Sequence, residues 1–349
     1  MYRGGFRLWR RISPPINLSA TRVPPPVADS DVMTADPPIL RARSAGWGPT
    51  TRELLRDTRR GHLVRVSHGR YVESNVWEAL DELARHRVRT RAVASSAMTD
   101  NVYSHHAAAA LWRIPLLGAW PMKVDVVGQR ESGGRSSEQI RRRAGAHDME
   151  VCTIDDLRVT SPAQTAADLA RILPRIEAVA AIDSACWRGR SGPRASVEHV
   201  RAIIDRNAED RGGQRATDAV TFATDLAESV WETASRVVIE ELGFPRPVLQ
   251  QSFRWSASST YRVDFWWPEQ GIIGEFDGLV KYAPAAGVDP RDTLIREKVR
   301  EDRLRSMASG FVRWTASDVR DAERFVRLLS AAGLPRTPPR HAYANAIRA

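Results

Sequence analysis

Polar and apolar residues alternate in two neighbouring segments, and this pattern predicts a β-hairpin. The segments are residues 261–267 and 272–277, and alternation with a period of two is typical of strands that bury one face. Residues 268–271 (PEQG) between them have the composition of a turn. The apolar face of this hairpin should carry Val263, Phe265, Trp267, Ile272, Gly274 and Phe276.

The polar face of the predicted hairpin gathers carboxylates. With the turn centred between residues 269 and 270, Asp264 lies opposite Glu275, and Arg262 lies opposite Asp277. Opposed residues on paired strands are about 4.5–5.5 Å apart at Cβ, where two like charges destabilise the pair. Asp264 and Glu275 therefore need a cation, a shared proton or a basic neighbour. A divalent ion such as Mg²⁺ would meet this need. The alternative is a solvated strand face on which Arg262 neutralises Asp277.

Near the start of the chain, a second pattern predicts a basic helix followed by a hairpin. Thr50 or Thr51 can cap a helix that runs to Gly61, because Thr accepts hydrogen bonds from the first turn and Gly suits the position after the last. The runs LVRV and YV, joined by SHGR, predict a hairpin over residues 63–72. Residues 39–46 predict a further short helix, so that two helices precede a hairpin, as in winged-helix domains.

The region between residues 90 and 225 carries few chemical signals. We predict a helix after Ser104, a strand at residues 122–128, a basic loop at 130–143, and strand, turn and helix over 157–173. His105 and His106 are adjacent, so on a helix they diverge by about 100° and cannot bind one metal ion together. No phosphate-binding loop, nucleophile elbow or HExxH motif occurs, so the sequence gives no support for nucleotide hydrolysis, α/β-hydrolase or zincin chemistry.

Charge favours a polyanionic partner. The 349 residues carry a net charge of +10 with an isoelectric point near 10.3, and arginines cluster between residues 52 and 70. DNA is the partner that such a distribution indicates. The alternative is a genome that encodes Arg by default, because Lys123, Lys281 and Lys298 are the chain's lysines among 52 basic residues.

Composition also bears on compartment and on the ends of the chain. Cys152 and Cys186 are isolated and lack metal-ligand spacing, which favours a reducing cytoplasm. No apolar run approaches the roughly 18 residues of a membrane span. Residues 1–36 are expected to be a disordered Pro/Arg-rich tail and 336–349 a flexible one. Translation from Met33 is an alternative to the N-terminal tail.

The C-terminal third resembles the very-short-patch-repair-like branch of the PD-(D/E)xK nucleases. The resemblance rests on Asp264, then EFDG from Glu275, then EKVREDRLRSMASGFVRWT from residue 297. It implies a restriction-endonuclease-like α/β/α fold in which Mg²⁺ binds between the carboxylates of Asp264, Glu275 and Asp277. The helix LAESVWETASRVVIEELGF (226–244) resembles the first core helix of that family, so Glu228 or, as we favour, Glu232 should complete the site.

One departure from the nuclease pattern concerns the catalytic lysine. The position two after Glu275, where the family carries lysine, is Asp277. Lysine migration occurs in this superfamily, so Lys281 or Lys298 could serve, with Lys281 preferred. A local ion pair with Asp302 is the alternative role of Lys298. Loss of catalytic activity is the rival explanation for the departure.

The N-terminal half resembles AbiEi-type antitoxins and related actinobacterial regulators. RELLRDTRRGHLVRVSHGRYV resembles their winged-helix domain, and SHHAAAALW with LRVTSPAQTAADLAR resembles their middle region. The likeness implies that the helix beginning at Thr51 enters the DNA major groove, that the following turn forms the wing, and that a cognate toxin is a partner. The candidate DNA contacts are Arg52, Arg56, Arg59 and Arg60 on the helix, with Arg65 and Arg70 on the wing. A solvated arginine face packing on the next domain is the alternative.

Together these patterns predict a mixed α/β protein in three parts. A winged-helix-like module occupies residues 37–75, a mixed α/β connecting domain 76–224, and an endonuclease-like α/β/α domain 225–335. The function expected first is a cytoplasmic DNA-binding protein that cleaves phosphodiesters with Mg²⁺. The alternative is an antitoxin or transcriptional regulator whose nuclease-like domain is catalytically inactive.

Overall fold

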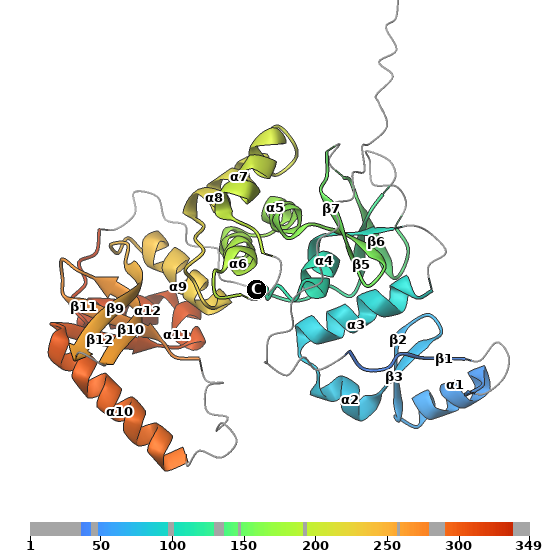
Figure 1. Cartoon of the computed structure of the whole chain (residues 1–349), viewed down its shortest axis with the longest axis horizontal. Coiled ribbons are helices and arrows are strands. Elements are labelled where there is room, and N and C mark those ends of the chain that lie inside the picture. Colours follow the sequence, from blue (N-terminus) through green and yellow to red (C-terminus); the bar gives the residue numbers. More distant parts are fainter. Residues whose placement is uncertain are drawn as a thin grey trace, which may run out of the picture.

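The computed structural model describes residues 36–42, 48–96, 101–128, 136–145, 148–190, 194–256, 259–278 and 290–337. Within these ranges the chain is a mixed α/β protein with twelve helices and three sheets. The C-terminal sheet lies at one end of the longest axis, and the N-terminal and middle sheets lie at the opposite end, on either side of α3 (Figure 1). The helices α5–α8 lie between the middle sheet and the C-terminal sheet (Figure 1). None of the helices in the described ranges is long and apolar enough to cross a membrane.

The first sheet forms the N-terminal module, with strand order β1-β3-β2. Its elements are β1 (Leu40–Arg41), α1 (Thr51–Arg59), β2 (Leu63–Ser67) and β3 (Arg70–Glu73). The predicted helix α1 and hairpin β2–β3 are confirmed. Thr50 and Glu53 cap α1 reciprocally, and Gly61 follows it with φ +78°. The short helix predicted at residues 39–46 is wrong where the chain is described, because β1 pairs there with β3.

The core of this module extends beyond residue 75. Val66 and Val72 of the hairpin pack against Val88 and Ala92, which lie on α3 (Glu82–Ala94) after the short α2 (Ser74–Ala79). The opposite face of α3 contacts the middle region, where α4 and β5 lie beside it. Helix α3 therefore connects the N-terminal sheet to the rest of the molecule (Figure 1).

The middle region combines a five-stranded sheet with a layer of helices. The strand order is β6-β5-β4-β8-β7. The strands are β4 (Val102–Tyr103), β5 (Val124–Val127), β6 (Ile140–Arg143), β7 (Val151–Ile154) and β8 (Leu157–Thr160). The helices are α4 (His105–Leu111), α5 (Pro162–Ile172), α6 (Arg175–Cys186), α7 (Val197–Arg206) and α8 (Gly213–Phe222). Many small alanines on α4–α6 are fully buried, which lets these helices pack closely.

The basic segment before residue 143 is not simply a loop. Residues 140–143 form β6 and pair in parallel with β5. Arg141 and Arg143 neutralise Asp125 of β5, whose side chain is fully buried, with Nε–Oδ1 distances of 2.6 and 2.9 Å. The arginine run therefore contributes to the core of the middle region, because a buried carboxylate needs such partners.

The C-terminal domain is a four-stranded sheet between two layers of helices. Its strand order is β12-β11-β10-β9, antiparallel except for the parallel pair β11–β12. The strands are β9 (Val248–Ser256), β10 (Ser259–Trp267), β11 (Ile272–Phe276) and β12 (Gly310–Trp314). Helices α9 (Val230–Glu241), α11 (Ala316–Arg320) and α12 (Ala322–Ala331) cover one face, and α10 (Pro290–Met307) covers the other.

The predicted hairpin is present in the predicted register. Phe265 pairs with Gly274, and Trp267 pairs with Ile272, on β10 and β11. Because Phe265 pairs with Gly274, the same register places the preceding residue, Asp264, opposite the following one, Glu275. The predicted apolar face is confirmed for most of its members, which pack under α9, α11 and α12. Val263 is the exception, since it packs with Ile273 and Leu304 on the α10 side.

Candidate functional site

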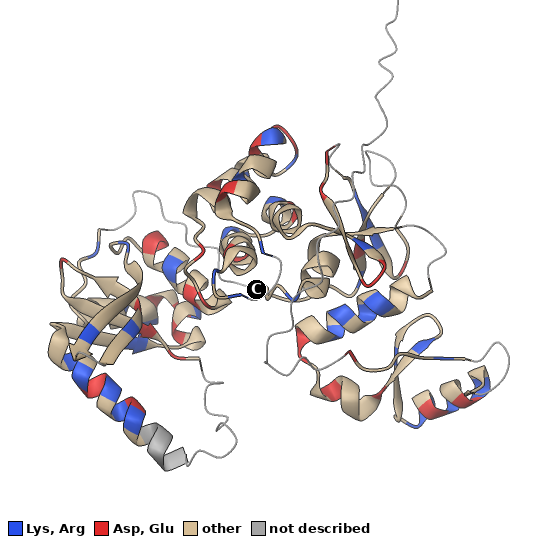
Figure 2. Cartoon of the chain, viewed as in Figure 1, with Lys and Arg blue, Asp and Glu red and all other residues tan. Residues whose placement is uncertain are grey.

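Helix α1 presents arginines to solvent. Of its residues only Leu54 is buried, and Arg52, Arg56, Arg59 and the adjoining Arg60 are exposed. Arg56 lies 3.5 Å from Asp57, with more than half of its side chain exposed. An exposed pair of this kind is weak, so the guanidinium groups remain available to an anionic partner. Figure 2 shows this helix at the edge of the molecule, on the side away from the middle region.

The two wing arginines differ in their surroundings. Arg65 is exposed; its guanidinium donates to the carbonyl oxygen of Ser67 and contacts Nδ1 of His68 at 3.1 Å. Arg70 donates instead to the hydroxyl and carbonyl oxygens of Ser95, at 2.8 and 2.7 Å. Because Ser95 ends α3, Arg70 fastens the hairpin to that helix. The structure therefore gives Arg65 the freer of the two guanidinium groups.

The second candidate region is the hairpin of the C-terminal sheet. Asp264 Oδ2 accepts a hydrogen bond of 2.9 Å from the backbone N–H of Phe276. This bond spans the two strands and holds the Asp264 carboxylate beside β11, as the sequence pattern predicted.

Glu275 lies between two arginines that the sequence interpretation missed. Its side chain is 9% exposed and pairs with Arg300 of α10 at 2.5 Å and with Arg313 of β12 at 3.0 Å. Arg313 also contacts Glu297 and Glu301 of α10. The like-charge conflict between Asp264 and Glu275 is thus relieved at Glu275 by basic neighbours. The signal in the sequence was weak, since these arginines lie 25 and 38 residues beyond their partner.

Arg262 pairs with Glu228 at 2.5 Å. The neutralisation of Asp277 by Arg262, suggested by the hairpin register, is therefore not what the structure shows. Asp277 itself donates its backbone N–H to the carbonyl oxygen of Trp314 at 2.7 Å. This bond continues the β11–β12 pairing at the end of the strand, where the half-buried Asp277 leaves the sheet.

Glu232, in the first turn of α9, lies near enough to Asp264 of the hairpin for the two charges to interact. Its carboxylate accepts hydrogen bonds from the Ser229 hydroxyl and the Glu228 backbone N–H, and from Nε2 of Gln250 at 3.0 Å. Burial raises the pKa of Glu232 to about 7, and the nearby charge of Asp264 adds to the effect. Two carboxylates that repel each other are a feature of metal sites that lack their cation.

The structure describes only one of the two lysines considered for catalysis. Lys281 lies outside the described residues. Lys298 pairs with Asp302 at 3.2 Å on α10, and both side chains are largely exposed, so the local ion pair considered for Lys298 is confirmed. Over the described ranges, no group of three or more acidic, histidine or cysteine side chains is arranged to hold a metal ion. Asp264, Glu275 and Asp277 are therefore not assembled there as one set of ligands.

The adjacent histidines point to different partners. His106 Nδ1 lies 3.2 Å from the Asp125 carboxylate, and His105 Nδ1 lies 3.0 Å from the Ser104 hydroxyl. Burial would raise the pKa of Asp125, but hydrogen bonds from His106 and Arg141 hold it well below its usual range. Burial lowers the pKa of His105 to about 3. This buried cluster stabilises the middle sheet.

Two proteins of Mycobacterium tuberculosis are similar to part of this chain. The uncharacterized proteins MT2308 and Rv2248, from two strains of that organism, are each 29% identical to it over 181 residues. The match covers 52% of this chain and 62% of each relative. The chain thus spans less than two thirds of the length of these relatives. No family model matches the chain.

Proposed function

We propose that the protein binds duplex DNA through α1 and the β2–β3 turn, and that it acts as a cytoplasmic regulator of the AbiEi-antitoxin type. The observation that carries this proposal is the exposed arginine face of α1, with Arg52, Arg56, Arg59 and Arg60. A helix laid in the major groove brings such side chains to phosphate oxygens and base edges. A toxin encoded beside it would be the protein partner of such a regulator.

Replacing Arg52, Arg56 and Arg59 of α1 and the adjoining Arg60 by glutamine tests DNA binding. The substitutions keep long polar side chains on an exposed face, so α1 should still fold, as circular dichroism would verify. Binding of a fluorescent duplex by the full chain should weaken by at least about 100-fold, because each lost phosphate contact removes a charge-assisted bond. Unchanged anisotropy titrations would contradict the proposal.

We further propose that the C-terminal domain has an endonuclease-like fold without cleavage activity. Glu275 already has two arginine partners, Arg300 and Arg313. A Mg²⁺ ion at Glu275 would have to separate these two pairs and would place its charge beside two partly buried guanidinium groups, which would then keep only Glu297 and Glu301 as counterions. The family's lysine position holds Asp277, which adds negative charge where the reaction needs positive charge.

A second candidate function, Mg²⁺-dependent cleavage of DNA, is favoured by Glu232 and Asp264. The two side chains are close enough for the Asp264 charge to raise the pKa of Glu232. A divalent cation between them would relieve the repulsion and lower that pKa. In this reading Lys281 would stabilise the charge that develops on the phosphate.

A cleavage assay with Mg²⁺ or Mn²⁺ on duplex and single-stranded DNA separates the two functions. The regulator proposal predicts no cleavage by the wild-type chain. The nuclease reading predicts cleavage that Asp264→Asn abolishes and that Lys281→Ala slows by about 100-fold or more. Lys298→Ala is the matched control, because Lys298 pairs with Asp302 on the surface, and it should cleave like the wild type.

A further inference from the structure

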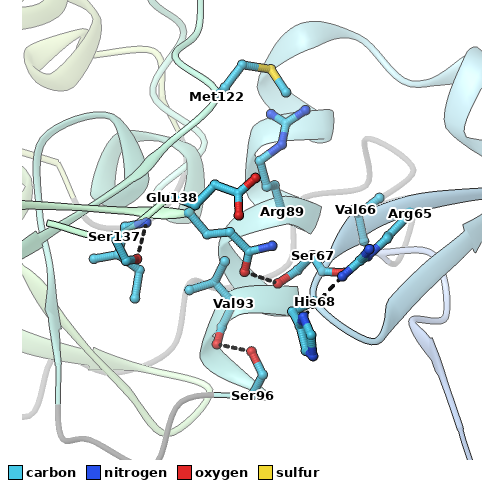
Figure 3. Close-up of a pocket in the computed structure, with 12 residues that line it drawn as sticks. Arg65, Val66, Ser67, His68, Arg89, Val93, Ser96, Met122, Ser137 and Glu138 are labelled. Carbon is cyan, nitrogen blue, oxygen red and sulfur yellow. Dashed lines mark hydrogen bonds between the residues drawn. The ribbon is translucent and has the colours of Figure 1, made fainter.

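A pocket of about 650 Å³ lies between the N-terminal module and the middle region (Figure 3). Arg65 and His68, from β2 and the β2–β3 turn, form one end, and Arg89 of α3 lies near Met122. Glu138, from the segment before β6, lines the facing wall. Its volume is within the range of small-molecule sites in proteins, which is roughly 300–1,000 Å³.

Two of the charged side chains that line this pocket, Arg89 and Glu138, lack partners within the described part of the chain. Arg89 is half-buried and lies 5.5 Å over the ring of Trp77, but among the described residues it has no hydrogen bond or ion pair. Burial lowers the pKa of Arg89. Glu138 is exposed, and it too has no hydrogen bond or ion pair to a described residue. A half-buried charge without a partner is costly, and an anionic group bound at Arg89 would offset that cost.

The rest of the lining is divided between apolar and hydrogen-bonding side chains. Val66, Val93 and Ile140 supply apolar surface, while Ser67 donates its hydroxyl to Oε1 of Gln139 at 2.9 Å across the two walls. A pocket with an apolar wall and a few convergent polar groups is typical of sites for organic molecules. Three basic side chains against one acidic side chain favour an anion that also carries a hydrogen-bond donor.

We propose that this pocket binds a phosphate-bearing organic molecule of the size of a nucleoside monophosphate. The phosphate would contact Arg89, and Arg65 and His68 would turn toward it from the other end of the pocket (Figure 3), since guanidinium groups bind phosphate oxygens in pairs. The flat, weakly polar body would lie on the apolar wall, and Glu138 would accept a hydrogen bond from a ring or exocyclic N–H. Neither DNA binding nor cleavage requires such a site, so the inference goes beyond the proposed function.

Binding in this pocket would oppose DNA binding through Arg65. A ligand phosphate that draws the Arg65 guanidinium group into the pocket would withdraw it from a DNA phosphate outside the pocket. The two ligands should therefore weaken each other's binding by the same factor, because such coupling is reciprocal. The coupling rests on the proposed function, whereas the pocket's own affinity does not.

Calorimetric titration of the full chain with the four 5′-ribonucleoside monophosphates, and with inorganic phosphate, tests the site. At least one nucleotide should bind with a Kd below about 1 mM and more tightly than phosphate, which lacks the body and donor. Arg89→Met and Glu138→Gln should each weaken this binding by about tenfold or more. Arg327→Gln, an exposed arginine of α12, is the control and should bind like the wild type.

Three results would overturn the site: no heat with any of the five probes, phosphate binding as tightly as the nucleotides, or nucleotide affinity unchanged in both pocket variants. Thermal unfolding without nucleotide shows whether Arg89→Met is folded. If that variant is not folded, the nucleotide affinity of Glu138→Gln tests the site in its place.

The coupling is tested by duplex affinity at saturating nucleotide, which should fall in the wild type and not in Arg89→Met. Nucleotide binding with undiminished duplex affinity would refute the coupling alone. A chain that binds nucleotide and no DNA would refute the proposed function and leave the site standing.

Discussion

Glu232 is a carboxylate of the C-terminal domain whose ionisation is opposed both by burial and by a neighbouring negative charge. Glu232 lies in the first turn of α9, and its carboxylate accepts a hydrogen bond from the backbone N–H of Glu228. The Asp264 charge nevertheless lies close enough to oppose ionisation of this carboxylate. Burial, and to a smaller extent the Asp264 charge, raises the pKa of Glu232 from 4.5 to about 7. A group whose pKa is higher in the folded than in the unfolded state binds its proton more tightly when folded.

Stability should therefore decline as the pH rises from about 4.5 through about 7. Over this window the unfolded chain loses the Glu232 proton before the folded chain does. We expect this residue to lower the free energy of unfolding by roughly 2 kcal/mol between pH 5 and pH 8, allowing for partial solvent exposure. Glu232→Gln should lack this component of the decline. Urea unfolding of both proteins at several pH values measures it, and identical pH profiles would contradict it.

The side-chain contacts of the candidate site were only partly predictable from the sequence. The positions of Asp264 and Glu275 followed from alternation and a turn, which are local properties. The pairing of Glu275 with Arg300 and Arg313 was not foreseeable, because it depends on how α10 crosses the sheet and on which strand β11 pairs with. Arg70 was missed as a structural residue for the same reason, since its partner Ser95 lies at the far end of α3.

Among the elements, β11 shows how a glycine admits large neighbours. A Cβ added at Gly274 would lie 2.6 Å from the Trp314 ring and 2.9 Å from the Trp267 ring. Both indoles are almost fully buried and are held by hydrogen bonds from their Nε1 atoms, to Ser235 and to the carbonyl oxygen of Pro245. Neither ring can move away without breaking such a bond.

Gly274→Ala should destabilise the protein by about 1–3 kcal/mol through overpacking. Gly278→Ala is the matched control two residues beyond the strand, because its nearest neighbour would be a Phe276 ring atom at 3.8 Å. Thermal or urea unfolding compares the two variants with the wild type. Equal effects of the two substitutions would show that the close approach of the indoles is not what Gly274 permits.

The elements that the sequence predicted are those with strong local signals. Helix α1 has its capping residues and terminal glycine, and the two hairpins have alternation and turn residues. Strands β1 and β6 were missed because both are short and are defined by their partners, β3 and β5. The arginines of β6 read as a solvated loop, since the sequence does not reveal that Asp125 lies buried beside them.

Over the whole molecule, a buried ion pair joins the C-terminal domain to the middle helices. Arg236 of α9 donates to Asp183 of α6 at 2.7 Å and lies 4.2 Å over the Phe222 ring. Asp183 also accepts from the Thr233 hydroxyl and the Thr224 backbone N–H. Helix α9 thus packs on both cores, so the boundary placed at residue 225 on sequence grounds precedes an element that the two regions share.

Arg236→Met should cost about 3–5 kcal/mol, because it leaves the Asp183 carboxylate buried without its counterion. Adding Asp183→Asn removes that charge and should restore part of the loss. Urea unfolding of the single and double variants, compared with the wild type, gives both free energies. A single variant as stable as the wild type would mean that the pair does not hold the two regions together.

The central claim, that α1 binds DNA phosphates, is tested most directly by the salt dependence of duplex affinity. We expect log Kd to rise steeply with log salt concentration for the wild type, and Arg56→Gln to reduce the slope by about one unit. Arg327→Gln is the matched control, since Arg56 and Arg327 are both exposed helical arginines with a weakly placed carboxylate, at 3.5 and 3.7 Å. It should keep the wild-type slope. Equal slopes for all three proteins would contradict the claim.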